Sequence, residues 1–137
     1  MSFYIGIDLG TSGLKAVLVT PEGVVKSVGS GTYPIEIPRP GYAEQDPELW
    51  YDVLCRAVRD AMTQAHAKAA DVAGIGISGH MHGTIPLDKQ GRLLHPAVLW
   101  CDQRTGKEKE DVIDKIGVDQ LGRWVQNNVN AGFQSLT

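Results

Sequence analysis

Residues 7–15 hold the densest set of groups in the chain that could bind a phosphate. Asp8 ends a short apolar run and is followed at once by a turn of small residues. A buried carboxylate is costly unless it is paired or bound to metal, and the backbone N–H groups of a glycine-rich turn can approach an anion closely. The pattern therefore favours an aspartate that holds Mg²⁺, directly or through water, beside a phosphate-binding turn. The candidate residues are Asp8, Gly10, Thr11, Ser12, Gly13 and Lys15.

The same residues also fit a plain β-hairpin in which Asp8 caps its own turn. A D-x-G-T pattern alone does not separate these two interpretations. A Walker A loop is excluded, because the spacing G-x-x-x-x-G-K-[ST] is absent. The phosphate interpretation therefore needs support from other segments.

A second candidate segment, residues 78–83, sets two histidines and a methionine between glycines after an apolar run. Ligands bind outside the carboxyl ends of strands in open α/β sheets. His82 could therefore form a hydrogen bond with a polar ligand, and Met81 could pack against its carbon skeleton. Zinc binding by His80 and His82 is an alternative, although no Cys or third His stands at a familiar spacing. A turn with solvent-facing histidines is the third interpretation.

A third candidate segment follows another apolar run. Trp100 offers a flat surface for a sugar ring, and Asp102 and Arg104 offer an acceptor and a donor for hydroxyl groups. The alternative is a core tryptophan beside an exposed Asp–Arg pair.

The remaining reactive side chains suggest structural or surface roles. Cys101 is not a credible nucleophile, because no base adjoins it. With only two cysteines the chain forms at most one disulfide, which disfavours a secreted disulfide scaffold and favours a reduced, cytoplasmic protein. We expect His66 and His95 at the surface or behind the site. The charged residues 107–111 suit a solvated helix face.

The first half of the chain predicts a small sheet followed by a helix. Runs rich in apolar and β-branched residues predict strands, and their short connections make neighbouring strands antiparallel. Several breakers then predict an extended loop. Asp46 suits an N-cap and Pro47 a first helical position, before apolar residues at three- and four-residue steps. The predicted elements are strands 4–9, 15–20 and 24–28, a loop at 34–43, and a helix from 48 to about 67.

The second half predicts one more buried strand, further sheet and two helices. Residues 72–78 are continuously apolar, which is typical of a strand buried on both faces. Thr105 and Glu108 fit a capping box. The other predicted elements are sheet at 84–87 and 96–100 around a turn at 88–91, a helix at 105–116 and a short helix at 119–127. The order favours an α/β fold with a mixed sheet flanked by helices.

Length, composition and charge exclude several classes of protein. The 137 residues suit one domain. With 42% apolar residues and a net charge of −3, the chain does not suit global disorder, and its charge gives no reason to expect binding to nucleic acid or an anionic membrane. No secretory signal opens the chain, and no apolar run approaches the ~20 residues that span a bilayer.

Four segments, in this order, resemble the N-terminal end of the FGGY family of carbohydrate kinases, and bacterial xylulokinases in particular. They are residues 4–13 with Lys15, residues 44–47 before Trp50, residues 79–83, and residues 97–100 with Asp102 and Arg104. The resemblance implies a ribonuclease H-like fold of the actin and sugar-kinase superfamily. It also implies a two-lobed kinase whose sugar and ATP meet between the lobes.

The resemblance assigns a role to each candidate residue. Asp8 would position Mg²⁺ and the phosphates of ATP, and the turn of Gly10, Thr11, Ser12 and Gly13, with Lys15 nearby, would face those phosphates. Met81 and His82 would line the sugar site, with Trp100, Asp102 and Arg104 beside it. The implied reaction phosphorylates D-xylulose to D-xylulose 5-phosphate, in a cytoplasmic enzyme whose oligomeric state, a homodimer included, stays open.

The sequence departs from the family pattern in two ways. His80 stands where the xylulokinase loop usually has Gln, so gluconate, ribulose and fuculose remain alternative substrates. The family's general base, its FGGY signature and its adenosine-binding lobe match nothing before residue 137, which predicts one inactive lobe, residues 1–137, of a longer kinase. Two further interpretations are a non-catalytic sugar- or nucleotide-binding module and a purely structural actin-like domain.

Overall fold

We describe the protein from a computed structural model, which describes residues 2–126 and 131. The chain divides into two compact units, and each is described by itself. The first unit comprises residues 1–34 and 47–80, and the second comprises residues 35–46 and 81–137. Each unit is therefore assembled from two separate stretches of the chain.

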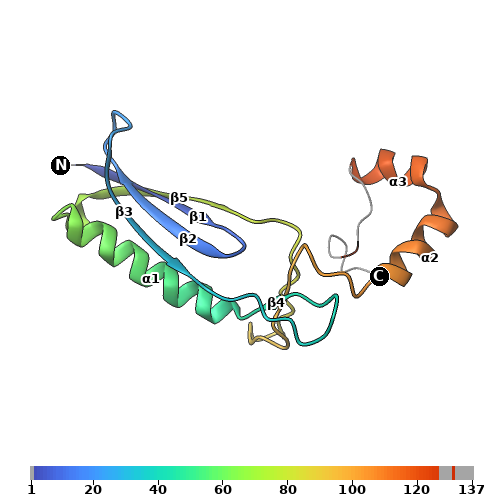
Figure 1. Cartoon of the computed structure of the whole chain (residues 1–137). Helices are drawn as coiled ribbons and strands as arrows, with labels where there is room; N and C mark the ends of the chain where they lie inside the picture. Colours follow the sequence, from blue (N-terminus) through green and yellow to red (C-terminus); the bar gives the residue numbers. More distant parts are fainter. Residues whose placement is uncertain (1, 127–130, 132–137) are drawn as a thin grey trace. The chain divides into compact units, whose positions relative to one another are not determined.

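A four-stranded mixed sheet forms the first unit (Figure 1). Its strands stand in the order β3-β2-β1-β5, with β1, β2 and β3 antiparallel and β5 parallel to β1. The prediction of three antiparallel neighbours is confirmed, and β3 is longer than predicted. The strands are β1 (Phe3–Leu9), β2 (Gly13–Val19), β3 (Val25–Thr32) and β5 (Val72–Gly79).

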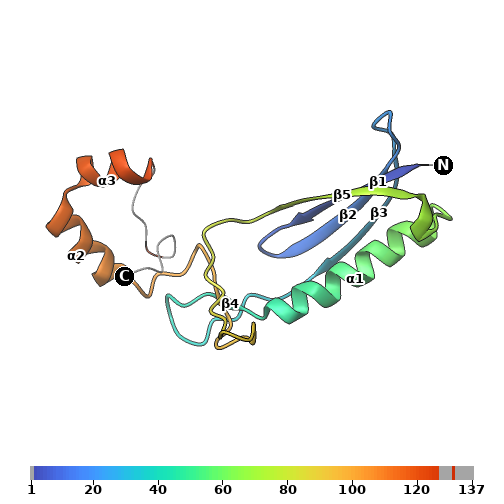
Figure 2. The same cartoon turned by 180° about the vertical axis from the view of Figure 1, so that it is seen from behind.

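Helix α1 (Pro47–Gln64) lies along one face of this sheet, as Figures 1 and 2 show from opposite sides. It packs against β3 and β2 and buries Trp50, Val53, Ala57 and Ala61, in agreement with the predicted apolar face. The approach to β3 is close, because a methyl group at Gly29 would lie 1.9 Å from the carbonyl oxygen of Ala57. A glycine at this position is therefore required by the packing.

The prediction that residues 72–78 are buried on both faces is wrong. Strand β5 stands at the edge of the described sheet, and Ile75 and Ile77 are 61% and 73% exposed. They share a face with their register partners Ile5 and Ile7, which are buried. In the described sheet β1 lies between β2 and β5, whereas β5 has a neighbouring strand on one side only. The same apolar pattern is therefore buried on β1 and exposed on β5. The short 3₁₀ turn Ala69–Asp71 leads into this strand.

Short strands and loops form most of the second unit. Strand β4 (Glu44–Gln45) pairs antiparallel with β6 (Ala97–Val98). Isolated bridges join Glu36 to Glu44, Thr84 to Val98, and Leu87 to Leu93. The predicted loop at 34–43 and the predicted turn at 88–91 are confirmed. The N–H of Gly91 closes the turn by donating to the Asp88 carbonyl at 3.0 Å, and Gly91 has a φ of 79°.

Two helices follow β6 at nearly the predicted positions. They are α2 (Gly106–Ile116) and α3 (Val118–Val125), and residue 127 of the predicted second helix lies outside the described residues. The predicted capping box is wrong, since the Thr105 side chain makes no capping hydrogen bond at the N-terminus of α2. Within the described residues, no helix combines the length and apolar character needed to cross a membrane.

Candidate functional site

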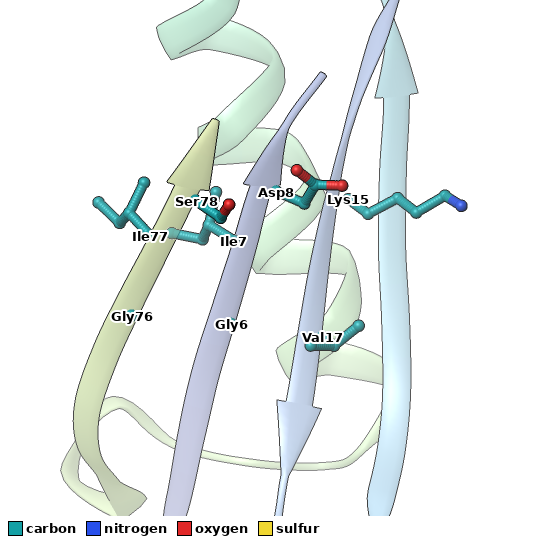
Figure 3. Close-up of a pocket in the computed structure, with 8 residues that line it drawn as sticks. All are labelled: Gly6, Ile7, Asp8, Lys15, Val17, Gly76, Ile77 and Ser78. Atoms are coloured by element: carbon teal, nitrogen blue, oxygen red, sulfur yellow. The ribbon is translucent and has the colours of Figure 1, made fainter. Parts of the chain in front are cut away.

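Asp8 lies in a polar row across three neighbouring strands of the first unit. Its register partners are Lys15 on β2 and Ser78 on β5. Side chains alternate between the two faces of a strand. Because Ile7 is buried on the α1 face, Asp8 stands on the opposite, exposed face. Figure 3 shows the Asp8 carboxylate between Ser78 and the Lys15 backbone, with the Lys15 side chain extending away from it.

An open hollow of about 570 Å³ lies on this face. Two glycines, Gly6 and Gly76, stand opposite each other on β1 and β5 and leave its floor without side chains, and Val17 flanks it on β2 (Figure 3). The polar row of Lys15, Asp8 and Ser78 closes one end. The hollow therefore offers a carboxylate and a hydroxyl group to a ligand at the carboxyl ends of β1 and β5, and Lys15 lines the same end.

The predicted phosphate-binding turn, residues 10–13, directly follows β1 and is called here the phosphate turn. It is closed by the backbone N–H of Gly10, which donates to the Gly13 carbonyl at 2.9 Å. A methyl group at Gly13 would lie 2.7 Å from the carbonyl oxygen of Gly31 on β3. The absence of a side chain at Gly13 thus lets the turn lie against the neighbouring strand.

Tyr33 holds the phosphate turn, and the sequence did not identify it. Its hydroxyl donates to the Gly10 carbonyl at 2.6 Å, and its backbone N–H donates to the Ser12 carbonyl at 3.4 Å. The ring is buried, 6.4 Å from the Trp50 ring. Burial, and then the negative charge of Asp8, raise the pKa of the Tyr33 hydroxyl above its ordinary value. No local pattern marks this residue, since the contact spans 23 positions.

The donor set fits a metal that is bound together with phosphates. A protein-bound Mg²⁺ keeps several waters and takes one or two carboxylates plus substrate phosphate oxygens. No group of three His, Cys, Asp or Glu that could hold a metal occurs among the described residues. The single exposed carboxylate of Asp8 suits Mg²⁺ that arrives with a nucleotide. The same finding leaves the zinc alternative at His80 and His82 without a third ligand in the described part of the chain.

His80 closes the first unit with both ring nitrogens buried. Its backbone N–H donates to the Leu9 carbonyl at 2.8 Å, which extends the pairing of β5 with β1. The ring meets Trp50 edge to face at 5.2 Å, and neither nitrogen has a hydrogen-bond partner among the described residues. Burial lowers the pKa of this imidazole, so the fold favours the neutral ring.

Met81 and His82 open the second stretch of the second unit. Met81 is 69% exposed, and His82 has a φ of 67°, in the left-handed region that non-glycine residues rarely adopt. The antiparallel bridge between Thr84 and Val98 brings the segment before Thr84 beside the segment after Val98. Met81 and His82 therefore lie near the turn that carries Trp100.

Trp100 occupies a turn, residues 99–102, called here the tryptophan turn. The Asp102 N–H donates to the Leu99 carbonyl at 3.0 Å, so Trp100 and Cys101 are the two central residues. Leu99 and Asp102 are fully buried, whereas Trp100 is 42% exposed. The turn thus presents the indole from a buried base, and Trp100 is not the core tryptophan of the alternative interpretation.

Asp102 and Arg104 form a largely buried ion pair, with side-chain exposures of 0% and 19%, rather than the exposed pair of the alternative interpretation. The Asp102 carboxylate accepts hydrogen bonds from the Ala43 N–H and from the backbone and guanidinium of Arg104. Arg104 also donates to Glu44 at 2.5 Å and lies over the Tyr42 ring at 4.0 Å. Burial alone would raise the pKa of the Asp102 carboxyl, but these hydrogen bonds outweigh it and hold the pKa below its ordinary value.

The other histidines lie at the surface, as expected. His66 is exposed after α1, and the ring of His95 lies 3.7 Å from the Glu44 carboxylate, where it adds an ion pair only when it is protonated. Most of residues 107–111 are exposed on α2, which confirms the predicted solvated face.

The predicted site residues divide between the two units. Asp8, residues 10–13 and Lys15 lie on or between β1 and β2 in the first unit. Met81, His82 and the tryptophan turn belong to the second unit, where the bridge between Thr84 and Val98 joins their two segments. Each group lies at the end of paired strands.

Comparison with known proteins relates this arrangement to kinases. Residues 3–135 match the N-terminal domain of the FGGY family of carbohydrate kinases. A xylulose kinase of Staphylococcus xylosus is 39% identical over 133 residues, which cover 97% of this chain and 27% of that protein. The chain thus spans about a quarter of the length of the curated relatives it matches.

Solved structures agree with this family match. The crystal structure of a protein from Brucella ovis, described as a xyloylose kinase, aligns with a TM-score of 0.89 at 32% identity and covers 96% of this chain and 27% of that chain. A gluconate kinase from Lactobacillus acidophilus aligns with a TM-score of 0.88 at 27% identity, over 96% of this chain and 26% of that chain. The fold is therefore the ribonuclease H-like fold of sugar kinases, as predicted.

Proposed function

The chain belongs to the FGGY family of carbohydrate kinases, and on this premise we propose that it takes part in the ATP-dependent phosphorylation of a sugar hydroxyl. D-xylulose, converted to D-xylulose 5-phosphate, is the proposed substrate. The observation that carries the proposed reaction is the family match over residues 3–135. The xylulose kinase of Staphylococcus xylosus, matched along 97% of this chain, supports the choice of sugar.

The first unit is proposed to hold the phosphates of ATP. Asp8 would hold Mg²⁺ through water or directly, and the ion would neutralise charge on the phosphate oxygens. The backbone of the phosphate turn, Gly10 to Gly13, would approach those oxygens, with the hydroxyl groups of Thr11 and Ser12 beside it. Lys15 is exposed and has no ion-pair partner among the described residues, so its charge is available to a phosphate.

The second unit is proposed to bind the sugar. Met81 would pack against the carbon skeleton, His82 would form a hydrogen bond with a hydroxyl group, and the exposed face of Trp100 would lie against the sugar. Asp102 and Arg104 stand directly behind Trp100 in this proposal. Phosphoryl transfer needs a positioned base and both substrates, and residues outside this chain are proposed to supply that base. A cytoplasmic location is part of this proposal, because ATP is available there.

Gluconate is the second candidate substrate. The structure of the gluconate kinase from Lactobacillus acidophilus supports it, because its TM-score nearly equals that of the first structure compared. The histidine at position 80 also departs from the glutamine that xylulokinases usually have there. A carboxylate-bearing substrate would need a cation in its site, which a test of sugars against sugar acids would reveal.

The first experiment is the intact mass of the protein as its source makes it, followed by ADP release with a panel of D-xylulose, gluconate, D-ribulose, fuculose and glycerol. We expect ADP release with D-xylulose and the lowest KM for that sugar. ADP release with gluconate alone would establish the second candidate. A folded protein that releases ADP with none of these compounds, yet is stabilised against heat by a sugar, would be a binding module instead.

Two substitutions test the assigned residues in the same assay. Asp8→Asn should abolish Mg²⁺-dependent turnover, because the amide cannot replace the negative charge beside the phosphates. His82→Ala should raise the KM for the sugar at an unchanged KM for ATP. His66→Ala is the matched control, because His66 is exposed and lies outside the proposed site. Near-normal turnover by Asp8→Asn would remove the proposed metal role.

A further inference from the structure

The tryptophan turn is clamped at both ends by a single residue, Ala43. The Leu99 N–H donates to the Ala43 carbonyl at 2.9 Å, and the Ala43 N–H donates to Asp102 Oδ2 at 2.7 Å. The next residue, Gln103, donates its N–H to the Gly41 carbonyl at 2.7 Å. Both backbone groups of Ala43 are therefore used to hold the turn against the segment before β4.

Every acceptor position of the Asp102 carboxylate is already used. Oδ1 accepts from the backbone N–H and Nε of Arg104, at 2.8 and 2.9 Å. Oδ2 accepts from Ala43 N and from Arg104 Nη2, at 2.7 and 2.8 Å. An ionised carboxylate has about four acceptor sites, and this side chain has no exposed surface. A sugar hydroxyl would have to displace one of these donors to reach it.

Arg104 is held on three sides. Its guanidinium pairs with Asp102 and with Glu44, which are both buried, and it lies over the face of Tyr42 at 4.0 Å. Such a planar, bidentate arrangement fixes both charged partners in one geometry. Because Glu44 belongs to β4 and Asp102 ends the tryptophan turn, Arg104 ties the turn to the strand.

We propose that Asp102 and Arg104 are positioning residues that fix the indole of Trp100, and that neither is a ligand of the sugar. This inference rests on the proposed function in one respect only, that Trp100 contacts the sugar. The Asp102 side chain has no exposed surface and that of Arg104 is 19% exposed, whereas Trp100 is 42% exposed. In sugar recognition, a flat indole contributes only in the orientation that its turn imposes.

The first test follows Trp100 by ¹⁹F NMR in the chain labelled with 5-fluorotryptophan. The three tryptophans give three resonances, and Trp100→Phe identifies that of Trp100. Arg104→Met should shift or broaden the Trp100 resonance and leave that of Trp50 in place. Arg92→Met is the matched control, because Arg92 forms an ion pair with Asp88 but is 79% exposed.

An unmoved Trp100 resonance in Arg104→Met would overturn the proposal. If that variant does not fold, Glu44→Gln provides the second test. It neutralises one of the two carboxylates that pair with Arg104 and leaves the Asp102 bonds in place. In Glu44→Gln we expect a smaller shift of the Trp100 resonance than in Arg104→Met. In Arg104→Lys the Trp100 resonance should lie between its positions in the parent and in Arg104→Met. No shift in Glu44→Gln would overturn the proposal equally.

The second test is a double-mutant cycle on kcat/KM for the sugar in the whole enzyme. If Arg104 acts through Trp100, losses of about 10-fold for Arg104→Met and about 30-fold for Trp100→Ala should combine to about 30-fold in the double variant. A multiplied loss of about 300-fold would indicate independent contacts and make Arg104 a ligand. If the parent protein turns over no sugar, the proposed function fails, and the NMR test still decides the positioning role.

Discussion

The two turns that carry the proposed substrate contacts are held by opposite means. The phosphate turn, residues 10–13, is closed by backbone hydrogen bonds and by the neutral hydroxyl of Tyr33. The tryptophan turn, residues 99–102, is held by Asp102, Arg104 and Glu44, three charged side chains that are largely buried. The phosphate turn is proposed to bind anions, and its neighbouring carboxylate, Asp8, is proposed to face them through Mg²⁺. A sugar carries no such charge, so an ion network can support its contact residue.

The largest loss of stability should come from a substitution in the tryptophan turn. In Asp102→Asn, the amide nitrogen must replace either Oδ2, which faces the Ala43 N–H and Arg104 Nη2, or Oδ1, which faces the backbone N–H and Nε of Arg104, and all of these are donors. We expect a loss of about 3 kcal/mol in the free energy of unfolding, because a buried charge loses its partner. Urea denaturation measures it. The control is Asp88→Asn, in an ion pair with the exposed Arg92, and it should change stability far less.

The phosphate turn should be destabilised by a steric clash and not by the loss of a charge. In Gly13→Ala, the new methyl group would lie 2.7 Å from the Gly31 carbonyl oxygen, so β2 and β3 must separate. Overpacking of this kind costs about 1–3 kcal/mol. The control is Gly106→Ala, where no atom lies within 4 Å of the new methyl group. Equal stability of the two variants in urea would show that the turn tolerates a side chain and would weaken the comparison.

The smallest and most selective effects should appear at opposite ends of the pH scale. The pKa of Tyr33 is raised by burial and by Asp8, so its contribution to stability is complete below pH 10.0 and is lost as the pH rises above that value. The pKa of Asp102 is lowered by its hydrogen bonds despite burial, so its contribution is complete above pH 3.8 and is lost as the pH falls further.

Unfolding measured across pH for Tyr33→Phe and Asp102→Asn tests this contrast. Relative to the parent, Tyr33→Phe should reduce the alkaline loss of stability and Asp102→Asn the acid loss. Tyr51→Phe, at an exposed tyrosine on α1, controls for the phenol itself. An alkaline loss that is the same in Tyr33→Phe and the parent would mean that Tyr33 does not hold the phosphate turn in solution.

Local patterns predicted most of the elements. The sequence predicted β1, β2, the apolar face of α1 with Trp50 and Val53, and the turn at residues 88–91. Each of these features depends on neighbours within a few positions of the chain. The exposure of β5 could not be predicted in this way. Its apolar run matches that of β1, and only its place at the edge of the described sheet leaves Ile75 and Ile77 exposed.

The order of residues along the chain establishes which chemical groups this protein offers and which strands they follow. An aspartate before a glycine-rich turn, a Met-His pair and a Trp-x-Asp-x-Arg segment are properties of the chain, and so is its family. Folding then selects which of these groups face outward. Tyr33 reaches Gly10 across 23 positions, and Ala43 reaches Asp102 across 59. Because a hydrogen-bonding partner this distant is chosen by packing, only the folded chain shows Asp102 as saturated and Trp100 as exposed.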